Sequence, residues 1–145
     1  MGVATDYGAV QVSRTPGSLQ RLRNKVTVLR QLREQGIWLV DASIAALYLP
    51  GQRKPAARIR GTVIQTSWDA YTKFVVEEAA PSAVLCIGVG VARALRPRLD
   101  RLGIPWAAVH QPQARLSSEE HTRILATYSA VCDDPRRIGL VPSLG

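Results

Sequence analysis

Apolar residues recur at two different periods along this chain, and the two periods alternate. Near the beginning, apolar side chains are spaced three or four residues apart with arginines between them, which predicts an amphipathic helix with a basic outer face. Ser18 is the expected N-cap of this helix, and Gly36 its C-terminal cap. A continuous apolar run over 37–42 then predicts a short buried strand. The apolar positions of the helix are Leu19, Leu22, Val26, Leu29 and Leu32.

An exposed loop and a second helix are expected next. The stretch 48–61 is rich in proline, glycine and basic residues, which is typical of a loop. From 62 to 80 the apolar residues return to a helical period, and this helix is expected to pack against the sheet until Pro81 ends it. The residues predicted on its buried face are Ile64, Trp68, Tyr71 and Val75.

Two further strands are predicted, with a helix between them. The stretches 83–88 and 104–110 are continuously apolar up to the final His110, as buried strands of a parallel sheet are. A helix over 90–102 joins them; Pro97 either delays its start or kinks it, and Gly103 closes it.

The last predicted helix opens on a capping box. Ser117 is followed three residues later by Glu120, a spacing that marks a helix start, and the tail from residue 133 is expected to be irregular. The buried side of this helix is predicted to carry Ile124, Leu125, Tyr128 and Val131.

Helices that alternate with continuous apolar strands indicate an α/β protein. We expect a three-layer α/β/α sandwich with a short, mainly parallel sheet, in a single domain over 1–145 with irregular ends at 1–17 and 133–145. Three strands are few for such a sheet, so an amino-terminal strand is either hidden in residues 1–12 or missing from this chain.

Charge adds a partner class to this picture. The 145-residue chain has a net charge of +8, and the stretch 14–60 alone holds ten basic and two acidic residues. A one-sided positive field attracts phosphate backbones, largely through counterion release. A solvated arginine-rich surface without a ligand is the alternative.

Several function classes are not indicated. No apolar run reaches the ~18 residues that span a bilayer, and no secretory signal opens the chain, so we expect a cytoplasmic protein without a membrane partner. Cys86 and Cys132 lack zinc-site spacing, so neither a metal nor a cofactor is expected. The turn at 88–91 sits where glycines cradle phosphate, but Arg93 occupies the third glycine site, and a close strand-to-helix turn also explains it.

Polar residues follow two of the predicted strands. Asp41 and Ser43 come at the end of the first, and His110 and Gln111 at the end of the third. Because the carboxyl ends of parallel strands open onto one edge of a sheet, Asp41 and His110 are expected to share a cleft. Local capping by Asp41 and a purely structural role for His110 are the alternatives.

The order of these segments resembles the second half of the uracil-DNA glycosylase superfamily. The stretches that carry the resemblance are "GIWLVDASIAALY", then "GQRKPAARIRG", then "EEAAPSAVLCIGVGVARAL" and "IPWAAVHQPQARLSSEEH", and together they cover roughly residues 18–130. In that family one strand ends in a base-reading asparagine or aspartate, and another ends in a histidine-proline-serine loop that presses on DNA. Here a glutamine separates the histidine from the proline, and Gln113 replaces the serine.

The resemblance implies a role for each matching residue. His110 matches the catalytic histidine, and "TDYGA" at 5–9 is the candidate for the water-activating motif, with Asp6 as carboxylate and Tyr7 as stacking ring. Asp41 matches the base-reading side chain, with Ser43 beside it. The residues expected to contact DNA are Gln111, Gln113, Arg115, Arg53 and Lys54.

Three hypotheses follow. The first is a DNA-binding protein, acting on double- or single-stranded DNA, whose expected activity is hydrolysis of the N-glycosidic bond of a flipped-out damaged base. The second is a non-catalytic relative of this fold that binds nucleic acid or a protein partner. The third is a small α/β protein that acts on nucleotides through the turn at 88–91.

Overall fold

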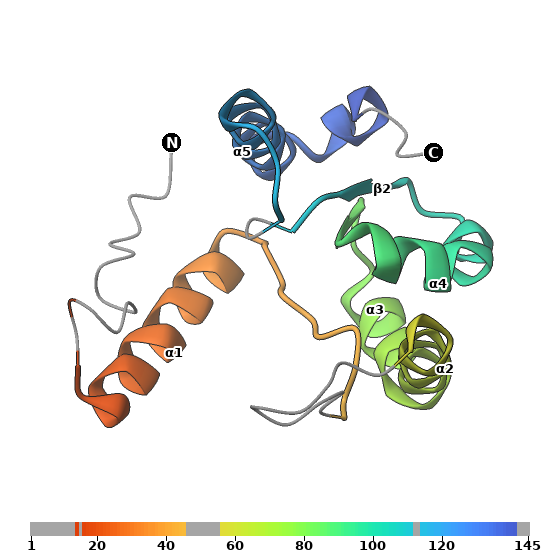
Figure 1. Cartoon of the computed structure of the whole chain (residues 1–145), viewed down its shortest axis with the longest axis horizontal. Coiled ribbons are helices and arrows are strands. Elements are labelled where there is room, and N and C mark those ends of the chain that lie inside the picture. The colour runs from red at the N-terminus through yellow and green to blue at the C-terminus, as the bar shows by residue number, and fades with distance from the viewer. Residues whose placement is uncertain (1–13, 15, 46–55, 112–113, 142–145) are drawn as a thin grey trace. The chain divides into compact units, whose positions relative to one another are not determined.

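The computed structural model describes residues 14, 16–45, 56–111 and 114–141 (Figure 1). It divides into two compact units, Met1–Val40 and Asp41–Gly145. Most of the predicted loop 48–61, and most of the positions before residue 16, lie outside the described residues.

The first unit is built around one helix, α1 (Ser18–Glu34), as the periodicity predicts. Its N-cap is Gly17 rather than Ser18, and no side chain caps it. Its end is a Schellman motif: Gly36 adopts a φ of 78°, the Gly36 N–H donates to the Arg33 carbonyl, and the Ile37 N–H donates to the Leu32 carbonyl. The helix buries none of its residues.

The segment 37–42 is not a strand, and this prediction was wrong. It has no strand pairing within the described residues, and Trp38, Leu39 and Val40 are exposed. An apolar run becomes a strand only where a neighbouring backbone pairs with its N–H and C=O groups. The run also packs locally, because the Arg33 guanidinium lies over the Trp38 ring, 5.0 Å from its centroid.

The second unit contains a two-stranded parallel sheet. Strand β1 (Val84–Ile87) pairs with β2 (Trp106–Val109), with Val84 opposite Trp106 and Ile87 opposite Val109. Helix α4 (Val89–Leu99), extended by the 3₁₀ turn η3 (Asp100–Leu102), connects the two strands, so the chain forms a β-α-β unit. Both strands and the helix form where they were predicted, but only Cys86 and Val109 of the strands are buried, and the helix begins at Val89, so Pro97 does not delay its start.

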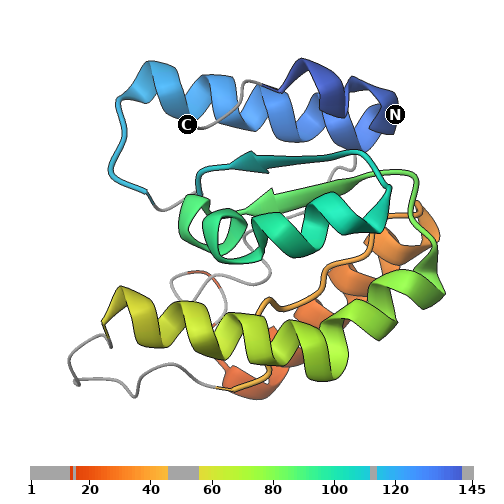
Figure 2. The same ribbon diagram turned by 90° about the vertical axis from the view of Figure 1, so that its right-hand side faces the viewer.

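Helices cover both faces of this sheet (Figure 2). Helix α5 (Ser118–Asp133) lies on one face, while α4 lies on the other with the long helix formed by α2 (Ala57–Ser67), the π-helical turn η2 (Trp68–Thr72) and α3 (Lys73–Ala79). The second unit is therefore a small α/β sandwich, and the predicted fold class is confirmed. No helix of the described residues has the length and apolar character needed to cross a membrane.

The core lies between the sheet and the long helix. Leu99 of α4 is its most buried large side chain, with 1% of its surface exposed. The Gln65 side chain donates to the Ala94 carbonyl, and Arg98 pairs with both carboxylate oxygens of Asp69, so polar contacts also join the two helices. The buried residues of this core are Ile64, Trp68, Val76, Cys86, Ala92, Leu95 and Leu99.

The π-helical turn changes which residues face the core. The helix starts at Ala57, five residues before its predicted beginning, and Ile64 and Trp68 are buried as predicted. Tyr71, however, is 52% exposed, and Thr72 and Val76 are buried in place of Tyr71 and Val75. A π-helical turn has more residues per turn than an α-helix, so the buried stripe moves one residue along the chain.

The C-terminal part confirms the capping box and corrects the tail. Ser117 and Glu120 form the predicted reciprocal cap, but Leu125 is 59% exposed because it lies off the buried side of α5. The tail is not irregular throughout, because a 3₁₀ helix, η4 (Pro135–Leu140), follows α5. Its Ile138 is 4% exposed, so burial of one apolar side chain orders this segment.

Candidate functional site

The carboxyl edge of the sheet brings together the end of β2 and the turn after β1. The Val109 carbonyl accepts the last strand hydrogen bond from the Gly88 N–H, at 2.7 Å. His110 follows and is half-buried. Its carbonyl lies beyond the paired strand residues and accepts a hydrogen bond from the Tyr128 hydroxyl on α5, at 2.9 Å. His110 is thus held at the point where the sequence places it.

Gln111 lies over the turn at Gly88. This glycine has a φ of 113°, a conformation that side chains rarely adopt, and a Cβ built on it would lie 3.4 Å from the Cγ of Gln111. The Gln111 carbonyl accepts a hydrogen bond from the Ala114 N–H at 2.9 Å, which turns the chain toward α5. Gln111 therefore lies against the β1–α4 turn, directly after His110 in the chain.

Helix α4 begins at the same edge. Its N-cap is Gly88, no side chain caps it, and its first turn has no acidic residue. The N-terminus of a helix favours negative charge, since its first N–H groups point outward and the peptide dipoles add. This part of the edge suits a phosphate or a polarised oxygen.

The start of α5 places a carboxylate near His110. The backbone N–H and the hydroxyl of Ser117 both donate to Glu120, at 2.9 and 2.8 Å. The hydrogen bond from the Ser117 backbone, and then that from its side chain, lower the pKa of Glu120, and the charge of His110 acts in the same direction. Arg115 is exposed in the loop that leads to this cap.

Asp41 and Ser43 make their contacts elsewhere in the unit. The Asp41 carbonyl accepts a 3.5 Å hydrogen bond from the Thr72 hydroxyl of η2, and the Ser43 hydroxyl donates to the Ala45 carbonyl at 2.7 Å. Since 37–42 is not a strand, the argument that two parallel strand ends place Asp41 beside His110 no longer holds. A base-reading role for Asp41 stays a prediction.

The remaining predicted site residues lie outside the described residues. These are Asp6, Tyr7, Arg53, Lys54 and Gln113. Among the residues that the structure describes, no group of three or more His, Cys, Asp or Glu side chains is arranged to hold a metal ion. Burial raises the pKa of the Cys86 thiol to about 11, which keeps it protonated and unreactive at neutral pH.

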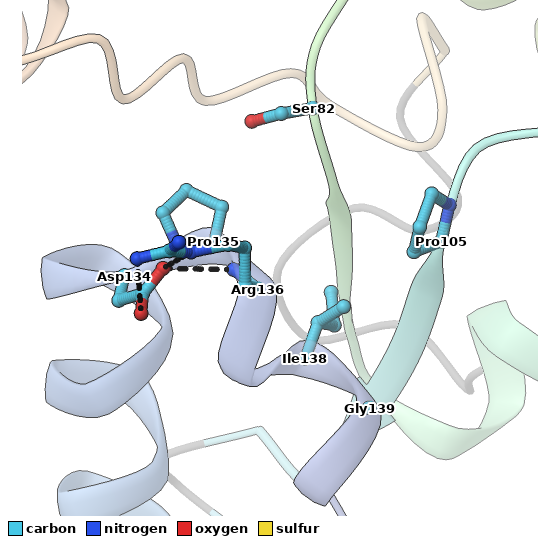
Figure 3. Close-up of a pocket in the computed structure, with 7 residues that line it drawn as sticks. All are labelled: Ser82, Pro105, Asp134, Pro135, Arg136, Ile138 and Gly139. Atoms are coloured by element: carbon cyan, nitrogen blue, oxygen red, sulfur yellow. Dashed lines mark hydrogen bonds and ion pairs between the residues drawn. The ribbon is translucent and has the colours of Figure 1, made fainter.

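A cavity lies at the opposite, amino edge of the sheet (Figure 3). Its volume is about 390 Å³, and its lining joins residues that precede the two strands to the 3₁₀ helix η4. Arg136 pairs with Asp134 at 2.9 Å between Nε and Oδ1, so the charges at its rim are paired. The lining residues are Ser82, Pro105, Asp134, Pro135, Arg136, Ile138 and Gly139.

Sequence reasoning missed two features of these edges. Tyr128 was expected only to fill the core, although a buried tyrosine hydroxyl usually has a partner, and that rule points to a hydrogen bond such as the one to His110. The cavity depends on η4, which the sequence pattern did not predict. Comparisons with protein-family models, with curated proteins and with solved structures found no match to this chain.

Proposed function

We propose that the protein binds DNA at the carboxyl edge of β1 and β2, and that His110 acts on the glycosidic bond of a base turned out of the duplex. The observation that carries this proposal is His110 itself, which directly follows β2 and whose backbone carbonyl accepts a hydrogen bond from Tyr128. The resemblance to uracil-DNA glycosylases supports it, because the histidine of that family also follows a strand at this edge.

The chemistry fits an imidazole at this place. When the glycosidic bond breaks, its electron pair goes to the base, water adds to C1′ of the sugar, and the proton released by water balances the charge of the base. An imidazole N–H that donates to the departing base stabilises the negative charge as it develops. The carboxylate that would direct the water is predicted to be Asp6, outside the described residues.

Charge supports DNA as the partner. Ten basic and two acidic residues lie between positions 14 and 60, and Arg115 is exposed beside the candidate site. Arginine side chains bind phosphate through paired N–H groups and release counterions from DNA.

We also place the protein in the cytoplasm, because Cys86 and Cys132 are free thiols, as a reducing compartment would leave them.

A non-catalytic relative that only binds nucleic acid is the second candidate. It is favoured by the position of Asp41, whose segment is not paired into the sheet and whose described contact is a backbone one to Thr72. Such an arrangement holds a base-reading carboxylate less firmly than a strand end does.

Strand-cleavage and binding assays separate these candidates. Duplex and single-stranded oligonucleotides that contain uracil are incubated with the protein and treated with alkali, which cleaves abasic sites. Excision that falls by about 100-fold or more in His110→Ala, with DNA affinity unchanged, supports the glycosylase. His121→Ala is the control, since His121 is the chain's other histidine and lies within α5.

A matched pair of arginine variants tests the binding surface. Arg115→Gln should weaken DNA binding and reduce the slope of log affinity against log salt by about one. Arg136→Gln, which changes another exposed arginine at the other edge of the sheet, should leave both unchanged. Binding without excision favours the second candidate, and no affinity for DNA at low salt overturns both.

A further inference from the structure

Tyr128 contacts His110 in a way that core packing does not require. Its hydroxyl donates to the His110 carbonyl at 2.9 Å, a contact between residues eighteen positions apart in the sequence. The ring is half-buried, and this burial raises the pKa of its hydroxyl, so the hydroxyl stays protonated and remains a donor at neutral pH.

The acceptor in this contact is the carbonyl group of the first residue after β2. The ladder between β1 and β2 ends at Ile87 and Val109, so the carbonyl of the next residue, His110, has passed the last paired strand position. A partly buried carbonyl without a partner is unfavourable, and here a side chain of α5 replaces the missing strand. The hydrogen bond therefore fixes the residue at which the chain leaves the sheet.

Helix α5 contacts the described residues on either side of positions 112–113. The capping box of Ser117 and Glu120 lies after these positions, where both donors of Ser117 reach one carboxylate oxygen. Tyr128 contacts His110 before them, while Gln111 rests on the Gly88 turn. These contacts fix the backbone from which the His110 imidazole projects.

We propose that Tyr128 is a positioning residue for His110, and that its hydroxyl sets the place of the imidazole at the carboxyl edge of the sheet. The effect of Tyr128 on base excision rests on the proposed function. The placement of the imidazole itself is measurable without any DNA.

NMR of the two histidine rings in Tyr128→Phe tests this placement. His110 and His121 are the only histidines, so two sets of ring signals are expected, and His110→Ala assigns them. In Tyr128→Phe we expect the His110 signals to shift or broaden, because the backbone that carries the ring loses its hydrogen bond. Tyr71→Phe is the matched control, because Tyr71 is 52% exposed, and it should leave the His110 signals in place.

The DNA assay supplies the second readout. If His110 acts as proposed, Tyr128→Phe should lower excision about tenfold, with a smaller effect on DNA affinity, because a displaced catalytic group affects the chemical step most. Should the phenylalanine variant fail to fold, 3-fluorotyrosine at position 128 keeps the hydroxyl as a more acidic donor, and it must shift the same His110 signals.

The outcomes separate the inference from the function. Unchanged His110 signals in Tyr128→Phe and in the fluorotyrosine protein overturn the positioning role, whatever the protein does with DNA. The opposite outcome is that the His110 signals shift in Tyr128→Phe, while His110→Ala leaves both DNA binding and excision unchanged. That result overturns the proposed function and leaves the positioning role in place.

Discussion

The two edges of the small parallel sheet differ in what they offer. At the carboxyl edge, His110 and Gln111 meet a positive-φ glycine and the beginning of α4. At the amino edge, Pro105 and Ile138 line a cavity of about 390 Å³ whose ion pair joins Asp134 to Arg136. The carboxyl edge therefore has polar residues whose backbone groups are hydrogen-bonded. The amino edge has a cavity lined by apolar residues and by one ion pair.

This difference shows that the cavity and the candidate chemistry lie apart. In open α/β sheets, ligands bind beyond the carboxyl ends of the strands, where loops and helix N-termini converge. The amino-edge cavity arises because η4 packs on the sheet through one buried side chain, Ile138. We therefore expect changes at the amino edge to alter stability, and changes at the carboxyl edge to alter binding as well.

The largest effect is expected for Ile138→Ala. Ile138 is 4% exposed, and truncating a buried isoleucine to alanine costs about 2–5 kcal/mol of unfolding free energy. Urea unfolding followed by circular dichroism measures this loss. DNA affinity, measured where the protein remains folded, should be unchanged, because the cavity lies at the opposite edge from His110.

Leu140→Ala is the control for this variant. Leu140 belongs to the same 3₁₀ helix but is 81% exposed, so its truncation should change the unfolding free energy by less than about 0.5 kcal/mol. Equal effects of the two variants would show that η4 does not pack on the sheet as described. Weaker DNA binding in Ile138→Ala would contradict the separation of the two edges.

A smaller effect is expected at the carboxyl edge for Gly88→Ala. The φ of 113° at Gly88 is strained for any side chain, which costs about 1–3 kcal/mol, and the new methyl group would lie in van der Waals contact with the Gln111 side chain at 3.4 Å. Unlike Ile138→Ala, this variant should also weaken DNA binding, because the strained turn lies directly against Gln111 at the proposed binding edge. Urea unfolding and a fluorescence binding titration measure the two effects.

Gly90→Ala provides the comparison two residues later. Gly90 lies in α4 and is exposed, and a Cβ there meets no atom within 4 Å, so alanine should leave stability unchanged or slightly raise it. A Gly88→Ala protein as stable as Gly90→Ala would mean that the turn after β1 does not have the described conformation.

Elements with local signals were predictable from the sequence. The capping box at Ser117 and the stop at Gly36 depend on neighbouring residues only, and both are present. The prediction of a strand over 37–42 was wrong because strand pairing depends on residues far away in the sequence. The predicted buried face of the long helix was wrong at Tyr71, because the spacing of apolar residues does not reveal a π-helical turn.

Only the part of the candidate site that depends on a local signal was predicted from the sequence. His110 directly follows a strand because residues 106–109 of the predicted strand 104–110 form β2. Its partner Tyr128 comes from eighteen residues further along, and Glu120 reaches its neighbourhood only because α5 starts at Ser117. Which side chains surround a strand end depends on tertiary packing, and the sequence pattern describes that only indirectly.

The smallest effect is expected for Ser117→Ala at the start of α5. Removing the side chain of an N-cap serine costs about 1 kcal/mol of unfolding free energy, since one helix N–H loses its acceptor. The effect should depend on pH. Hydrogen bonds from Ser117 lower the pKa of Glu120 below its ordinary value of 4.5, so the stabilisation is present above that value and disappears as the pH falls through the lowered pKa.

Urea unfolding at pH 7 and pH 3 therefore separates Ser117→Ala from a nonspecific change. The loss of stability should be larger at pH 7, and Glu120→Gln should remove the pH dependence, because glutamine accepts the hydrogen bonds but carries no charge to titrate. Ser118→Ala, which changes the next residue without removing the cap, should have little effect at either pH. A loss of equal size at both pH values in Ser117→Ala would mean that the Glu120 carboxylate takes no part in the cap, and the hold of α5 on the loop beside His110 would then depend on Tyr128 alone.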